Sequence, residues 1–137
     1  MKIAIASPHE VDAVWPQVSG YLLKSCDKIG SPMTVQEAWQ ICRNGSAYLV
    51  VCIGENEIEM ASVWRFETWP TGVVLRCYLL GGKNLKKWGK QLREFITDMA
   101  AKGGADRLIA EGRKEWGTFF NDAKELWRAY EVRINAG

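Results

Sequence analysis

The chain has 137 residues, of which 47% are hydrophobic and 25% are charged, a composition that argues against disorder and low complexity. Its length predicts a single domain spanning residues 1–137. The net charge of +2 is too small for a dedicated nucleic-acid binder, and no run approaches the ~18 apolar residues of a membrane span. The opening MKIAIASPHE is too short and too soon polar for a signal peptide.

The chain is predicted to begin with a strand and a long helix. Lys2–Ala6 is a short β-prone run, and Ser7–Glu10 then combines three helix-start signals: an N-cap serine, a proline at the first helical position and a glutamate three residues after the cap. Apolar residues keep helical spacing over Val11–Ile29. Because Pro16 falls inside this pattern, we expect the helix to be kinked or divided there.

A second helix and three strands are predicted next. Thr34 and Glu37 form another capping box, and the helix that they begin ends at Asn44-Gly45. Three β-prone runs follow with short connections, which predicts an antiparallel meander: Ala47–Ile53, Glu57–Phe66 and Val73–Leu80. The first of these runs is continuously apolar, so we expect it to be covered on both faces.

The rest of the chain alternates between helices and strands. Apolar spacing predicts a long helix that begins at Asn84 and ends at Lys102-Gly103-Gly104, and then a strand at Arg107–Ala110 that is parallel to the strand before the helix. A short helix at Glu115–Asp122 and an alternating strand at Leu126–Ile134 complete the prediction. The predicted fold class is α/β with a mixed sheet, in the order β-α-α-β-β-β-α-β-α-β, and with helices on both faces.

The cysteines and the single histidine do not have the spacing of a metal site. There is no CxxC pair, and His9 is the only histidine, so no metal is expected. Each cysteine lies among apolar residues, which indicates buried free thiols in a reducing compartment: Cys26, Cys42, Cys52 and Cys77.

The junction between the third meander strand and the long helix is the candidate anion site. Glycines between a strand and a helix N-terminus can present free backbone N–H groups to a phosphate, and basic residues follow the glycines here. The alternative is a plain turn with a solvated basic helix face. The candidate cofactor-binding residues are Leu80, Gly81, Gly82, Lys83, Asn84, Lys86 and Lys87.

The element order resembles the GNAT (Gcn5-related N-acetyltransferase) fold over nearly the whole chain. More specifically, Leu79-Leu80-Gly81-Gly82 with Trp88, and Gly112-Arg113 with Trp116, resemble motifs of short GNAT-like proteins from phage and prophage genomes. The resemblance implies an acetyl-CoA site where the strand and helix meet, with the pyrophosphate on a loop reading Q/R-x-x-G-x-G/A. The nearest match here, Lys86–Gln91, departs from that loop, which implies a degenerate site.

The resemblance also implies where catalytic groups would lie. A carboxylate near the central strands would act as base, and Glu67 and Glu111 are the available candidates, with Arg113 as a partner for a carboxylate or phosphate. The helix after the fifth strand lacks the tyrosine that often serves as acid. The alternative is that these residues are solvated strand-end charges. Trp69, expected to be exposed, and Trp116 are candidate interface residues.

Two functions from different classes follow from these residues. The first is a non-catalytic accessory, assembly or interaction protein of a phage or prophage, which would act in the host cytoplasm or the virion by binding another virion protein or itself. It would need no cofactor. The alternative is an active N-acetyltransferase that binds acetyl-CoA weakly through an unorthodox phosphate loop. Neither function implies a membrane or nucleic-acid partner.

Overall fold

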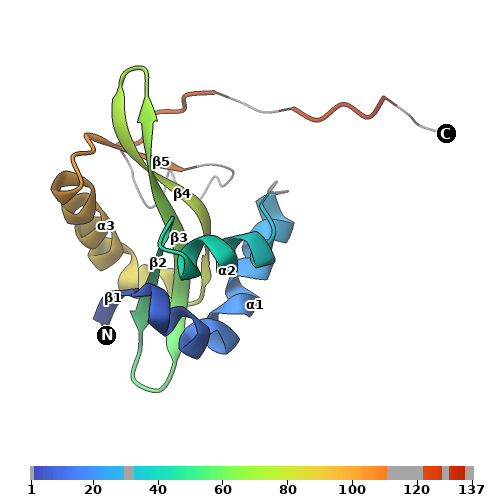
Figure 1. Ribbon diagram of the computed structural model, residues 1–137, viewed down its shortest axis with the longest axis vertical. Helices are drawn as coiled ribbons and strands as arrows, with labels where there is room; N and C mark the ends of the chain where they lie inside the picture. Colours follow the sequence, from blue (N-terminus) through green and yellow to red (C-terminus); the bar gives the residue numbers. More distant parts are fainter. Residues whose placement is uncertain (1, 30–32, 111–121, 128–129, 135–137) are drawn as a thin grey trace.

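The computed structural model describes residues 2–29, 33–110, 122–127 and 130–134, and its centre is a five-stranded mixed sheet (Figure 1). The strands lie side by side in chain order, and β1 to β4 are antiparallel to their neighbours, whereas β5 is parallel to β4. They are β1 (Lys2–Ala6), β2 (Tyr48–Ile53), β3 (Ile58–Trp69), β4 (Gly72–Gly82) and β5 (Arg107–Ala110). The predicted meander and the predicted parallel pair are therefore confirmed.

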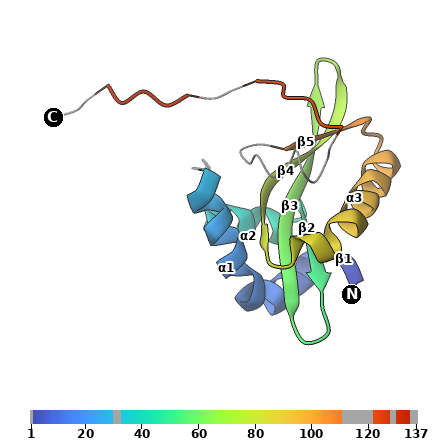
Figure 2. The ribbon, with the colours of Figure 1, turned by 180° about the vertical axis from the view of Figure 1, so that it is seen from behind.

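Helices cover both faces of this sheet (Figures 1 and 2). A short 3-10 turn at Pro8–Glu10 leads into α1 (Val11–Ile29), and α2 (Val35–Arg43) packs against α1 on one face. The third helix, α3 (Leu85–Lys102), lies on the opposite face. The mixed α/β architecture that the element order predicted is thus present, and the turn from β4 into α3 lies at one end of the sheet.

The sheet separates two hydrophobic cores. In β2, Leu49 and Val51 pack in the core beneath α1 and α2, whereas Val50 and Cys52 pack in the core beneath α3. All four side chains are buried, so the continuous apolar run of this strand is explained by burial on both faces. Trp88 of α3 belongs to the second core and is 1% exposed.

The helix starts follow the local signals of the sequence. A carboxylate oxygen of Glu10 accepts a hydrogen bond from the Ser7 backbone N–H at 2.9 Å, and the Thr34 hydroxyl accepts one from the Glu37 N–H at 3.1 Å. Pro16 does not divide the first helix, because α1 is continuous from Val11 to Ile29. Packing of α1 across the sheet holds the helix together where proline removes one backbone bond.

The end of the chain differs from the prediction. The helix expected at 115–122 lies outside the described residues except for Asp122, which is in a turn. The described residues within Leu126–Ile134 form no strand (Figure 1). Tyr130, Val132 and Ile134 are 80%, 80% and 97% exposed. Alternation of apolar and polar residues indicates which side chains would share a face of a strand. A strand also needs a neighbouring strand for its backbone hydrogen bonds, and the spacing of residues does not show whether such a neighbour exists.

Candidate functional site

The pairing of β4 changes halfway along the strand. Its first part pairs with β5, and this pairing ends with Cys77 opposite Ala110. On the other side, Val63 of β3 is paired with Leu79 and Trp64 with Cys77, so Tyr78 is an extra residue in β4 and forms a β-bulge. The described residues of β5 end at Ala110, so they give the pairing of β4 only as far as Cys77 on that side. The GNAT resemblance implies that a cofactor would lie beside this part of β4.

Glu67 lies opposite Val74, and its carboxylate has several hydrogen-bond donors around it, including the hydroxyl of the bulge residue Tyr78. One of its carboxylate oxygens accepts a bond from Trp69 Nε1 at 2.9 Å and one from Arg76 Nη1 at 3.3 Å, and the other accepts the Tyr78 hydroxyl. The Arg76 guanidinium also lies 5.0 Å from the centre of the Tyr78 ring. The side chains of Glu67 and Arg76 are 22% and 26% exposed, so this network is half-buried.

The two glycines of the predicted phosphate loop are instead packed against the chain's own backbone. A Cβ atom at Gly81 would collide with the carbonyl of Tyr21 in α1, and one at Gly82 would collide with the carbonyl of Glu59 in β3. Glycine is needed at both positions because α1 and β3 approach so closely. Fold packing therefore explains the Gly-Gly pair without a ligand.

The residues after the glycines are bonded to acidic residues at the β2–β3 connection. The Lys83 backbone N–H donates to the Glu59 carbonyl at 2.8 Å, and its ammonium forms an ion pair with Glu57. The Asn84 side-chain amide donates to the Glu59 carboxylate at 2.5 Å. The hydrogen bond to Glu57 raises the pKa of Lys83. Asn84 is the residue before α3, as predicted, but its φ is +60° and its side chain does not cap the helix.

Acetyl-CoA is the cofactor that the fold implies, and these residues do not fit its pyrophosphate. The turn between β4 and α3 contains only Lys83 and Asn84, and the donors just named already bind Glu57 or Glu59. The Leu80 backbone N–H is also used, because it donates to the buried Ser25 hydroxyl at 3.1 Å. An anion would have to displace these contacts and lie close to two carboxylates.

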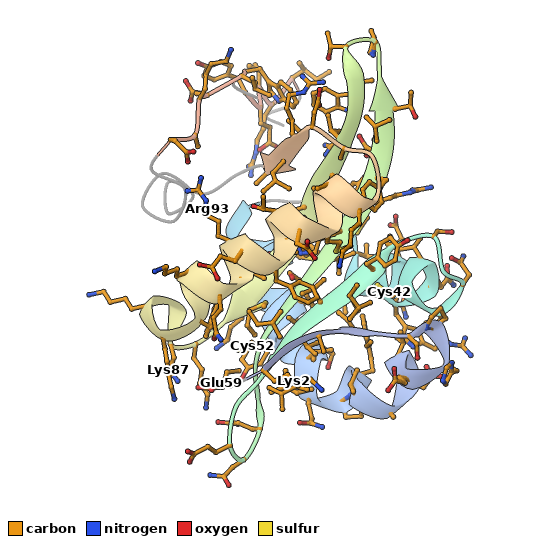
Figure 3. The ribbon with its side chains drawn as sticks, turned by 90° about the vertical axis from the view of Figure 1, so that its left-hand side faces the viewer. Lys2, Cys42, Cys52, Glu59, Lys87 and Arg93 are labelled. Carbon is orange, nitrogen blue, oxygen red and sulfur yellow. The ribbon has the colours of Figure 1, made fainter. Side chains whose placement is uncertain are left out.

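Lys86 and Lys87 are the remaining candidates for binding phosphate, and both are exposed in the first turn of α3. Figure 3 shows Lys87 at the same end of the molecule as Glu59 and Cys52. Burial raises the pKa of the Cys52 thiol, and the Glu59 charge raises it further, whereas Lys87 lowers it. The charges of Glu59 and Lys87 thus both lie within electrostatic reach of Cys52.

The other predicted site residues divide into two groups. Glu111, Arg113 and Trp116 lie outside the described residues. The expectation that Trp69 is exposed is wrong: it is half-buried, because its ring contacts Trp127 at 5.8 Å between ring centres and its indole N–H binds Glu67.

The sequence reasoning missed Tyr78 as a partner of Glu67 and missed the arginines that surround them. Residue spacing predicts only that Tyr78 lies in the strand Val73–Leu80, because the bulge that positions it leaves no signature in that spacing. The arginines were not singled out either, although two of them, Arg65 and Arg76, lie directly opposite each other across β3 and β4. Cross-strand register is the information that would have identified them.

A surface hollow of about 790 Å³ lies elsewhere, between the start of α1 and the end of α2. Its charged groups are already paired, because Arg43 contacts Asp12 at 3.2 Å and stacks over Trp39 at 4.5 Å. Within the described residues, no group of His, Cys, Asp and Glu side chains could hold a metal ion. No described helix is both long and apolar enough to cross a membrane.

The fold is that of GNAT acetyltransferases. The chain is similar to a ribosomal-protein-alanine N-acetyltransferase from Brucella melitensis biovar Abortus 2308, with a TM-score of 0.65, 14% identity, and coverage of 98% of this chain and 99% of that one. It is also similar to an aminoglycoside acetyltransferase from an uncultured soil metagenomic sample, solved with sisomicin (TM-score 0.68, 14% identity, 98% and 96% covered). A GNAT family acetyltransferase from Staphylococcus aureus gives a TM-score of 0.64 at 13% identity, with 97% and 98% covered.

No protein-family model matches the chain, and no curated protein sequence matches it. At identities of 12–14% the structural likeness establishes the fold alone. The GNAT-like fold that the element order predicted is therefore present, and function has to be argued from the site.

Proposed function

We propose that this GNAT-fold protein acts by binding a protein partner and does not use acetyl-CoA. One observation carries the proposal: the turn that would hold the cofactor's pyrophosphate is bonded to the protein itself. Glu57 and Glu59 bind the side chains of Lys83 and Asn84, and the Glu59 carbonyl takes the Lys83 N–H. In addition, Ser25 occupies the N–H of Leu80.

Electrostatics supports the same proposal. A pyrophosphate site needs several donors and a positive field, as at an uncovered helix N-terminus. Here the first turn of α3 carries lysines but also faces the Glu59 carboxylate, which is 6% exposed and cannot move freely into solvent. Releasing the donors would leave that buried carboxylate without its Asn84 contact, which is costly.

Thermal unfolding in the presence of acetyl-CoA tests the proposal. A dissociation constant of ~10 μM would add about 2.7 kcal/mol to the free energy of unfolding at ~1 mM ligand, which is easily measured. We expect no stabilisation of the wild-type chain. The double variant Glu57→Gln/Glu59→Gln keeps the turn but removes both negative charges, and stabilisation of this variant alone would show that the carboxylates block the site.

Stabilisation of the wild-type chain by acetyl-CoA, abolished in Lys86→Glu/Lys87→Glu, would overturn the proposal. The matched control for that variant is Lys90→Glu together with Lys102→Glu. It makes the same change in net charge on exposed positions of α3 beyond its first turn.

The second candidate function is an acetyl-CoA-dependent N-acetyltransferase with an unorthodox phosphate loop. It is favoured by Glu67, whose carboxylate contacts the hydroxyl of the bulge residue Tyr78 and could accept a proton from an amine, and by the acetyltransferase names of the structural neighbours. Because the turn does not fit the cofactor as it stands, this function requires the contacts of Glu57 and Glu59 to open. Acetyl-CoA-dependent modification of an amine, lost in Glu67→Gln, would establish it.

A phage or virion setting for the protein remains a prediction from the sequence motifs alone. The LLGG motif with Trp88 and the Gly112-Arg113 motif with Trp116 support it. Location of the gene among capsid, portal or tail genes would strengthen this setting, whereas location in a metabolic operon would argue for the enzyme.

A further inference from the structure

One end of the β3–β4 hairpin carries a concentration of arginine and aromatic side chains on one face of the sheet. Arg65 and Arg76 are paired across the two strands, and Tyr78 lies under Arg76. On the neighbouring strand β5, Arg107 lies 5.9 Å from the Trp69 ring centre. We call this surface the arginine face, and it consists of Arg65, Trp69, Arg76, Tyr78 and Arg107.

We infer that the arginine face binds an acidic peptide segment of a protein partner. This inference rests on the proposed function, for which it names the binding surface and the chemistry of the partner. Arginine, tryptophan and tyrosine are the residues that most often carry binding energy at protein interfaces. Here they meet on one surface although they come from three strands.

The arginine face is held in place before any partner arrives. The Glu67 carboxylate fixes Trp69, Arg76 and Tyr78 at once, and Arg107 donates to the Thr71 hydroxyl at 2.7 Å. Side chains that are fixed in advance lose less conformational entropy on binding. Glu67 is therefore a positioning residue: both of its oxygens face the protein's own donors.

Charge determines the kind of partner. Arg76 is paired with Glu67 at 3.3 Å and Arg107 with Asp106 at 3.2 Å. Arg65 is exposed, and no described carboxylate forms an ion pair with it. Like charges placed directly opposite each other in a sheet repel, so the Arg65–Arg76 pair favours an anion between them. Carboxylate fits the fork of a guanidinium, and a carboxylate-bearing segment would pair with the exposed Arg65.

The arrangement fits a peptide better than a nucleic acid. A nucleic-acid surface presents a continuous basic stripe, whereas here carboxylates of Glu67 and Asp106 lie among the arginines. Half-buried tryptophan beside a limited number of guanidinium groups is instead the composition of a protein-binding surface.

Fluorescence anisotropy with a fluorescein-labelled oligoglutamate peptide tests the inference, with oligolysine and a Gly-Ser peptide as controls. We expect the wild-type chain to bind oligoglutamate alone. Arg65→Glu should weaken binding about tenfold, because it turns an attraction into a repulsion. Lys90→Glu is the matched control, since it makes the same charge change at an exposed position of α3, on the other face, and should leave binding unchanged. Circular dichroism checks that both variants fold.

Three results would overturn the inference. They are absence of oligoglutamate binding to the wild-type chain, equal weakening by Arg65→Glu and Lys90→Glu, and binding of single-stranded oligothymidine as tight as that of oligoglutamate. Repeating the titration with ~1 mM acetyl-CoA separates this test from that of the proposed function. Binding of acetyl-CoA together with intact peptide binding would overturn the proposed function but not the peptide-binding role of the arginine face. Absence of both acetyl-CoA binding and peptide binding would overturn that role of the arginine face but not the claim that the protein does not use acetyl-CoA.

Discussion

At the scale of single residues, the chemistry of the candidate site depends on contacts between side chains that are far apart along the chain. Glu67 was identified from its place near a strand end, but what it does is set by Tyr78 and Arg76 on the next strand. Because both carboxylate oxygens of Glu67 accept hydrogen bonds from the protein, Glu67 orients the side chains that donate them. A glutamate that faced solvent without these donors would only add a negative charge to the surface.

The cysteines allow a residue-scale prediction of reactivity. Burial raises the pKa of Cys42 to about 12 and also raises the pKa of Cys26. Because the thiolate is the nucleophile, a raised pKa lowers the reactive fraction at any pH below it, and reactivity returns only as pH rises towards the raised value. We expect iodoacetamide at pH 8 to spare Cys42 in the folded protein. Cys26 is only partly buried and should react before Cys42.

Mass spectrometry of tryptic peptides after timed alkylation measures this order. The unfolded chain in guanidinium is the control, in which both thiols should react at similar rates. Alkylation of Cys42 at that unfolded rate under native conditions would show that the α2 side of the core opens readily.

At the scale of elements, the turn from β4 into α3 is shaped by what packs against it. Gly81 lies where α1 crosses β4, and Gly82 lies against β3. The sequence correctly predicted the glycines as the junction between a strand and a helix. It could not show whether the space beside them holds a ligand or the protein's own backbone, because that depends on how α1 crosses the sheet.

Two glycine substitutions test this packing. Gly81→Ala should lower the free energy of unfolding by at least about 1–3 kcal/mol, because its Cβ meets the Tyr21 carbonyl, which cannot rotate away. Gly20→Ala in α1 is the matched control: nothing lies within 4 Å of its Cβ, and alanine favours the helix by roughly 0.5–1 kcal/mol. Urea unfolding measures both. Equal stability of the Gly81→Ala variant and the wild type would show that the turn is looser than described.

The local signals of the sequence predicted the elements well where chemistry acts over a few residues. The capping residues Ser7 and Thr34 mark helix starts correctly. The apolar run Ala47–Ile53 correctly marks β2, the strand that is buried on both faces. The β3–β4 hairpin is longer than predicted, since β3 and β4 stay paired until Trp69 lies opposite Gly72. The residues near this turn show no clear alternation of apolar and polar side chains, so residue spacing does not predict their pairing. The bulge at Tyr78 and the end of the chain depend on neighbours in space, which residue spacing does not encode.

At the scale of the whole molecule, a single sheet is shared by the two hydrophobic cores. Leu22 of α1 and Leu92 of α3 are both fully buried, one in each core. Neither face of the sheet can lose its helices without exposing strands that also support the other face. The two cores should therefore unfold together.

Alanine substitutions on the two faces test this coupling. Leu22→Ala and Leu92→Ala should each lower the free energy of unfolding by about 2–5 kcal/mol. Each should shift one transition that is the same by tryptophan fluorescence and by far-UV circular dichroism. Leu23→Ala is the control, since Leu23 is 53% exposed and should change stability by no more than about 0.5 kcal/mol. Separate transitions by the two probes would contradict the coupling.

The length of the β3–β4 hairpin has a practical consequence. The pairing of β2 with β3 ends with Tyr48 opposite Trp64, and within the described part of the chain no strand pairs with β3 on that side from there to Trp69. An open strand can recruit a strand from another molecule, and charged side chains are what natural proteins use to prevent it. Arg65 and Glu67 occupy this stretch, and charged side chains in such a position disfavour pairing with a strand of another molecule. Substitutions here should therefore replace charge with charge, because an apolar residue at Arg65 would promote stacking of chains through this edge.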